Sequence, residues 1–163
     1  MEKNNLKKFL ICISLLLLIF ILDRISKLYV LNLNETNQAI NIYINSFINI
    51  NLIWNTGIGF GLFSSKTNLI YNAMTILIVF VNIIIIIMVF KAKDYKIFFL
   101  LMILGGSFGN LFDRLYFKGV PDFIDLHFKN FHWFIFNVAD IFITLGVICL
   151  IFAELFIKKK QLN

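Results

Sequence analysis

The chain has 163 residues, of which 60% are hydrophobic and 17% aromatic, and its mean hydropathy is +0.88. A soluble domain of this length could not bury so much apolar surface, whereas the hydrocarbon core of a bilayer can solvate it. The net charge is +6, but the lysines and arginines cluster at the ends of apolar segments and form no continuous basic stripe, which argues against a nucleic-acid partner.

Four apolar segments follow one another, at about residues 9–31, 68–90, 96–116 and 137–157. Each is long enough to cross a hydrocarbon core of about 30 Å with a helical rise of about 1.5 Å per residue. Asp23 and Arg24, rather than small residues, follow the first apolar stretch, so we expect an uncleaved helix and not a signal peptide. We therefore predict an all-α membrane protein with four transmembrane helices in a single domain, residues 1–163.

Three clusters of lysines set the predicted orientation. They precede the first segment, separate the second from the third, and follow the fourth, at residues 3–8, 91–96 and 158–160. Because connections rich in Lys and Arg stay in the cytoplasm, we expect both termini to be cytoplasmic. The connections 32–67 and 117–136 then lie outside, and 91–95 is a short inner turn.

The first outer connection has a pattern of its own. Isoleucine or leucine alternates with other residues over 40–45 and again over 48–52. A period of two indicates short strands with one apolar face. We therefore predict a small antiparallel β-sheet in this first outer loop.

Three of the four segments carry polar groups at their outer ends. These groups are Asp23, Arg24 and Lys27 in the first segment, residues 105–114 in the third and residues 136–140 in the fourth. Ionisable groups at membrane depth are costly and usually face a partner or a watery cavity. Helical spacing places Asn110 on one face with Asp113 and Arg114, and Asn137 on one face with Asp140. We expect these faces to enclose one polar pocket near the outer surface.

Several of these residues have a structural interpretation as well. Asp23, Arg24, Asp113 and Arg114 could equally be structural ion pairs. Close helix approach explains the Gly105–Gly109 pair, and Lys27 is expected to extend its amine toward the membrane surface.

Three other chemistries are less well supported. Residues 105–109 match Gly-x-Ser-x-Gly, but a nucleophilic Ser107 needs a strand before the motif, and here the run is helical. His127 and His132 stand five apart in a predicted loop without a zinc-binding pattern, so we expect no metal. Ser65 and Lys66 are adjacent, which fits a turn better than a catalytic dyad.

Aspartates offer a simpler chemistry. Two carboxylates in a partly dry site share a proton, so one can activate a water while the other donates to the scissile carbonyl. Such a pair needs no cofactor. The candidates are Asp23, Asp113, Asp122, Asp125 and Asp140, and spacing alone does not choose among them.

Five ordered sequence blocks resemble those of the lipoprotein signal peptidases, or signal peptidase II (peptidase family A8), over nearly the whole chain. The blocks are DRISK with Asp23, NTGIGFG with Asn55 and Gly57, GGSFGNLFDR with Asn110, Asp113 and Arg114, VPDFID with Asp122, and FNVAD with Asn137 and Asp140. Each block is weak alone, but all five in order are highly specific. Gly59 and Pro121 depart from the usual residues without removing a functional group.

The resemblance implies the roles of particular residues. It makes Asp122 and Asp140 the catalytic pair, with a supporting and substrate-contacting set of Asp23, Asn55, Gly57, Asn110, Asp113, Arg114 and Asn137. It implies an enzyme of the bacterial inner membrane, active at the outer face and inhibited by globomycin, and we expect a monomer. The implied substrates are diacylglyceryl-modified prolipoproteins, reached through membrane lipid and cut before the lipidated cysteine.

A non-enzymatic alternative stays open at this point. A small membrane carrier or lipid-binding protein could use the same aspartates to bind cations or protons. A transporter would place them near the bilayer midplane, whereas here they gather at one interface, which favours the peptidase.

Overall fold

The computed structural model describes residues 2–37, 41–57, 68–92 and 94–157. Four α-helices make up most of it: α1 (Glu2–Asn37), α2 (Asn68–Lys91), α3 (Lys96–Phe117) and α4 (Val138–Phe152), the last continued by a π-helical turn, η2 (Ala153–Ile157). All four are long and apolar enough to cross a membrane, with candidate spans Leu6–Thr36, Leu69–Lys91, Lys96–Phe117 and Val138–Leu155. The predicted set of four transmembrane helices is therefore confirmed.

Helix α3 is the centre of the bundle and packs against each of the other three helices. Half of its apolar window is buried (50%), against 11% for α1 and for α2. The outer helices instead expose large apolar side chains along their length, such as Leu18, Phe80 and Ile148. An apolar exterior of this kind is suited to lipid and not to water.

Glycines let α3 approach its neighbours closely. A Cβ on Gly105 would lie 3.1 Å from Ile19 of α1, and one on Gly109 would collide with the carboxylate of Asp23. On the other side, a Cβ on Gly106 would lie 2.5 Å from the carbonyl oxygen of Ala139 in α4. The expectation of close helix packing at Gly105 and Gly109 is confirmed, and it brings the polar ends of three helices together.

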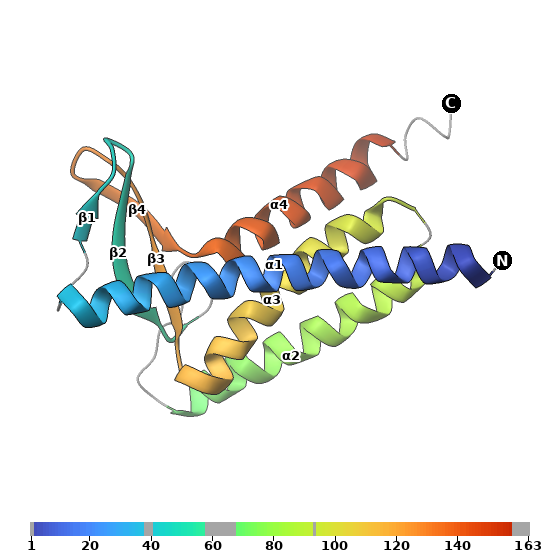
Figure 1. The fold of residues 1–163 in the computed structure, drawn as a ribbon, viewed down its shortest axis with the longest axis horizontal. Coiled ribbons are helices and arrows are strands. Elements are labelled where there is room, and N and C mark those ends of the chain that lie inside the picture. Colours follow the sequence, from blue (N-terminus) through green and yellow to red (C-terminus); the bar gives the residue numbers. More distant parts are fainter. Residues whose placement is uncertain (1, 38–40, 58–67, 93, 158–163) are drawn as a thin grey trace.

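A four-stranded antiparallel sheet lies at one end of the bundle, while the start of α1 and the end of α4 lie at the other (Figure 1). Its strands are β1 (Asn41–Tyr43), β2 (Ile48–Asn55), β3 (Val120–Phe128) and β4 (Phe131–Phe136), in that order. The strands expected over 40–45 and 48–52 are confirmed at 41–43 (β1) and 48–55 (β2), whereas Ile44 and Asn45 lie in the bend between them and Ile40 lies outside the described residues.

The sheet differs from the sequence prediction in one respect. It was expected in the first connection alone, yet half of its strands come from the second connection, residues 117–136. Most of β3 is buried on both faces, so its residues do not alternate between apolar and polar, and Pro121 and two aspartates further hide the pattern. Phe123 of β3 packs on Val30 of α1 and anchors the sheet to the bundle.

Candidate active site

Asp122 lies near the start of β3 and is only 2% exposed. Asn55, at the end of β2, donates from Nδ2 to Asp122 Oδ2 at 2.8 Å, and Asn137 donates from Nδ2 to Oδ1 at 2.6 Å. The backbone N–H of Gly57 donates to Asn55 Oδ1 at 2.9 Å, which fixes the direction in which the Asn55 amide points. Each oxygen of the Asp122 carboxylate is therefore held by a positioned amide.

Asp140 lies in the first turn of α4. Asn137 caps this helix, because its Oδ1 accepts the Asp140 N–H at 3.2 Å while its own N–H donates to Asp140 Oδ2 at 3.1 Å. This reciprocal pair is a capping box, in which two otherwise unpaired backbone donors are satisfied. Asn110 of α3 donates from Nδ2 to the other oxygen, Oδ1, at 2.8 Å. Asp140 is thus fixed by two helices.

Asn137 therefore contacts both aspartates at once. Burial, followed by the negative charge of Asp140, raises the pKa of Asp122 to about 7. Two buried carboxylates that interact in this way hold a proton near neutral pH, since both cannot ionise freely. The arrangement can supply a general base and a general acid side by side.

Beside this pair, four charged residues of α1 and α3 form a buried network. Lys27 Nζ lies 2.7 Å from Asp113 Oδ2 and 2.9 Å from Asp23, and it donates to Asn110 Oδ1 at 2.9 Å. Arg24 also donates to Asp113, at 2.7 Å. Lys27 is 0% exposed, so the expectation that its amine reaches the membrane surface was wrong. The attraction between its ammonium group and two facing carboxylates outweighs the hydration that the amine would gain at the surface.

Arg114 does not pair with its neighbour Asp113. Among the described residues, Asp113 pairs with Arg24 and Lys27, whereas the Arg114 guanidinium lies 5.5 Å from the ring centre of Tyr71 on α2. The Tyr71 hydroxyl donates to the Arg114 carbonyl oxygen at 2.7 Å. The guanidinium charge also interacts with the carboxylates of Asp122 and Asp140, and its buried Nη1 has no hydrogen-bond partner in the described part of the chain.

Two of these residues extend the predicted set. Lys27 could have been recognised as an ion-pair partner from its spacing of four residues after Asp23, which places both on one helix face. Tyr71 carried no such signal, because it lies on another helix, 43 residues from Arg114. All seven predicted supporting residues, by contrast, lie in this region, and Asp23 reaches α4 by accepting the Ala139 N–H at 3.1 Å.

The rival chemistries have different outcomes. Ser107 lies inside the continuous helix α3, so the strand–turn–helix of a serine-hydrolase elbow is not formed there. Ser65 and Lys66, as well as Gly59 and Phe60, lie outside the described residues. The loop expected around His127 and His132 was wrong, because these residues lie on paired strands.

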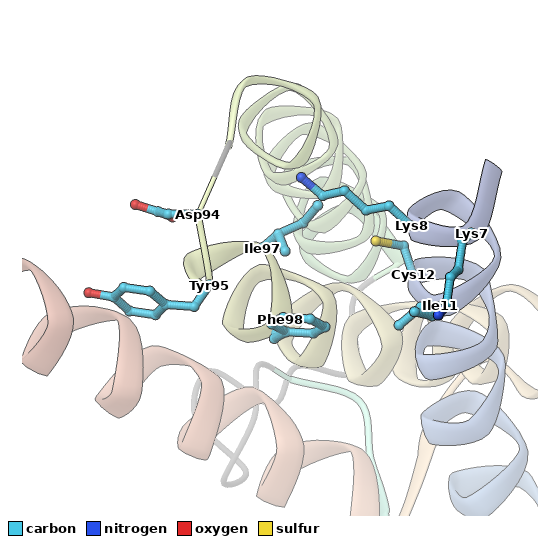
Figure 2. Close-up of a pocket in the computed structure, with 8 residues that line it drawn as sticks. All are labelled: Lys7, Lys8, Ile11, Cys12, Asp94, Tyr95, Ile97 and Phe98. Carbon is cyan, nitrogen blue, oxygen red and sulfur yellow. The ribbon is translucent and has the colours of Figure 1, made fainter. Parts of the chain in front are cut away.

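A depression at the opposite end of the bundle has no part in this site. Figure 2 shows that it is lined by the start of α1 and the start of α3, with Lys7, Lys8 and Cys12 on one side and Asp94 and Tyr95 on the other. It contains none of the predicted site residues, and its charged residues are Lys7 and Lys8 of α1 and Asp94 before α3.

Comparisons with known proteins show which family and fold the chain shares. The profile of the family described as signal peptidase (SPase) II matches residues 15–156. The chain is 53% identical to the lipoprotein signal peptidase of Pelagibacter ubique, over 100% of this chain and 98% of that protein. It is 41% identical to that of Anaplasma phagocytophilum, over 97% of this chain and 99% of that one.

The chain belongs to the signal peptidase II family. The membership makes it a peptidase, and the carrier alternative is not favoured. Two solved bacterial membrane enzymes share the fold, one with a TM-score of 0.71 at 26% identity over 93% of this chain and 91% of the other. The second has a TM-score of 0.66 at 27% identity, over 89% and 92% of the two chains.

Proposed function

We propose that this chain is an aspartic endopeptidase that removes the signal peptide from diacylglyceryl-modified prolipoproteins by cutting before the lipidated cysteine. We further propose that Asp122 and Asp140 are its catalytic residues. The observation that carries this assignment is that Asn137 donates to both carboxylates, from Nδ2 to Asp122 and from its backbone N–H to Asp140, while burial and the Asp140 charge raise the pKa of Asp122 to about 7.

The reaction needs only the two carboxyl groups and a water. The ionised carboxylate takes a proton from the water as its oxygen attacks the scissile carbonyl carbon, and the protonated carboxyl donates to the carbonyl oxygen. In the second step the C–N bond breaks, the leaving nitrogen takes the proton that the first carboxyl gained from the water, and a hydroxyl of the tetrahedral diol returns its proton to the other carboxylate, so the pair again holds one proton. Because atoms and charge balance over the cycle, no metal or cofactor is required.

The surrounding residues have positioning roles in this proposal. Asn55 with Gly57, Asn110 and Asn137 hold the carboxylates in place. The buried network of Asp23, Arg24, Lys27 and Asp113 braces α1 against α3 and orients Asn110 through Lys27. Arg114, which has a donor to spare, would hold a substrate carbonyl.

A site at the membrane interface suits a substrate that is itself anchored in lipid. A prolipoprotein with two acyl chains remains in the bilayer, so its scissile bond arrives at the interface. The start of α1, the end of α2 and the start of α3 lie at the end of the bundle away from the sheet and carry Lys7, Lys8, Lys91 and Lys96, which favours cytoplasmic termini. The proposal is therefore a monomeric, multi-pass enzyme of the bacterial inner membrane, with its active site at the outer face beside lipid and open to globomycin-type inhibitors.

Cleavage of two matched substrates tests this proposal. The purified enzyme in detergent would be given one preprotein with a diacylglyceryl-modified cysteine and the same preprotein unmodified, and the products would be analysed by mass spectrometry. We expect one cut, immediately before the modified cysteine, and no turnover of the unmodified chain. Cleavage at another position, or equal cleavage of both substrates, would contradict the assigned specificity.

A further inference from the structure

Three potential metal ligands meet where β3 and β4 form a hairpin. His127 on β3 lies directly opposite His132 on β4, and Asp125 is two residues before His127 on the same strand. Side chains two apart on a strand, and cross-strand partners, project from one face of a sheet. The ligand atoms of all three residues lie within 4.8 Å of one another.

Two buried atoms beside this cluster lack a partner. His127 is 7% exposed, and its Nδ1 has no hydrogen-bond partner among the residues that the structure describes. Asn49 lies opposite Asp125 on β2, and its buried Oδ1 is equally unpaired within the described chain. Buried polar atoms are almost always bonded, so two such atoms next to one Asp–His pair point to a missing ligand.

We propose that Asp125, His127 and His132 bind a divalent cation of the Zn²⁺ type, with Asn49 Oδ1 or a water in the fourth position. Imidazole nitrogens and carboxylate oxygens are ligands that Zn²⁺ prefers, at about 2.0–2.2 Å from the metal. Asp125 and His132 are already in contact, with Oδ2 and Nδ1 2.8 Å apart. His132 has a side chain that is 54% exposed, so it can rotate to close the site.

The two-residue turn of Lys129 and Asn130 explains why the sequence did not reveal this site. It pairs Phe128 with Phe131 and so brings two histidines that are five apart in the chain to opposite positions. The expectation of no metal relied on a predicted loop that has neither an H-E-x-x-H motif nor a cysteine pair, and it did not foresee a hairpin that adds Asp125 to the two histidines.

The site is separate from the catalytic pair. Asp125 lies three residues beyond Asp122, about 10 Å along the strand, and alternation turns the two side chains to opposite faces. A bound cation would join β3 to β4 and restrain the strand that carries Asp122 without touching substrate. Its role is structural, and it does not depend on the proposed function.

A Zn²⁺ titration of the purified full chain tests the site directly. The chain contains only two histidines, so an affinity tag without histidine leaves His127 and His132 as the imidazole ligands. Isothermal titration calorimetry in a Cys12→Ser/Cys149→Ser background removes the thiols as competitors. We expect a single saturable site, and His132→Gln and Asp125→Asn should each weaken Zn²⁺ binding at least about tenfold. Asp94→Asn, an exposed acid at the other end, is the matched control and should leave binding unchanged.

Thermal unfolding gives a second measurement. Saturating Zn²⁺ should raise the melting temperature of the parent protein but not that of His132→Gln, because a ligand that binds only the folded state stabilises it. His132→Gln also changes the hydrogen bond to the buried Asp125, so each protein is compared with and without Zn²⁺, and only the shift caused by the metal is used. Absence of saturable binding by the parent protein, or equal binding by parent and His132→Gln, would overturn the proposal.

Discussion

Asn137 donates a 2.6 Å hydrogen bond from Nδ2 to Oδ1 of Asp122. Through its Oδ1 and its backbone N–H the same residue caps α4 and holds Asp140. One side chain therefore fixes a carboxylate on a strand relative to a carboxylate on a helix. Positioning by regular elements is more exact than positioning by loops, which is what shared-proton chemistry requires.

Removing either carboxylate should stop the reaction. We expect Asp122→Asn and Asp140→Asn each to slow cleavage of a lipidated preprotein at least about a hundredfold, because the amide keeps the shape but cannot exchange the proton. Cleavage in detergent, with folding checked by thermal unfolding, measures this. Ser107→Ala is the control and should keep its activity. Near-normal turnover by either Asn variant would remove that aspartate from the catalytic pair.

The rate should fall as the pH rises above about 7. Burial, with the Asp140 charge, raises the pKa of Asp122 to about 7, so above that pH the pair loses its shared proton and its general acid. Single-turnover cleavage between about pH 5 and 9 should show a decline approaching tenfold per unit on the alkaline side. A rate that stays constant through pH 9 would mean that the proton of Asp122 is not used.

The stability of the folded protein should fall as Asp122 loses its proton. The ordinary pKa of 3.8 applies to Asp122 in the unfolded chain, so between about pH 4 and 7 the folded state binds more protons. This contribution to the free energy of unfolding is complete below about pH 4 and is lost as the pH rises through 7. Asp122→Asn cannot ionise, so its melting temperature should rise relative to the wild type as the pH increases.

Much of this fold follows from the sequence because lipid imposes simple rules. Segment length and hydropathy predicted the four helices, and the motif order predicted which aspartates lie at one end of them. Burial was harder to predict. Lys27 is fully buried because Asp23 and Asp113 face it, and the second of these partners is 86 residues away. Strand β3 was missed for a similar reason, since it is covered on both faces and has no period of two.

Removing the charge of Lys27 should strongly destabilise the fold. Lys27→Met leaves the carboxylates of Asp23 and Asp113 facing each other with only Arg24 to compensate them. Removing one partner of a buried ion pair costs about 3–5 kcal/mol, so the melting temperature in detergent should fall sharply. Lys91→Met makes the same change at an exposed position and should have little effect. Equal melting temperatures for the two variants would mean that the network is hydrated.

Cysteine labelling tests the orientation of the bundle. In a Cys12→Ser/Cys149→Ser background, Asn45→Cys and Lys129→Cys lie in turns that join strands of the sheet at one end of the bundle, while Lys7→Cys near the start of α1 and Lys91→Cys at the end of α2 lie at the other. A membrane-impermeant maleimide added to intact spheroplasts should label the first pair and miss the second. Labelling of the second pair alone would put the aspartates on the cytoplasmic side, where a translocated substrate could not reach them.

Arg114 is the residue whose structural and functional roles compete most closely. Its side chain packs on Tyr71, yet its buried Nη1 has no partner in the described structure and its charge acts on both aspartates. Arg114→Lys keeps the positive charge and most of the packing but loses the fork of donors. If that fork holds a substrate carbonyl, the variant should fold and cleave at least about tenfold more slowly, a barrier increase of about 1.4 kcal/mol.

Tyr71→Phe is the companion variant, because it removes only the hydroxyl bond to the Arg114 backbone and keeps the ring beneath the guanidinium. A slow Arg114→Lys with an active Tyr71→Phe assigns Arg114 to the substrate, whereas full activity of Arg114→Lys would leave it a packing residue of the α2–α3 contact.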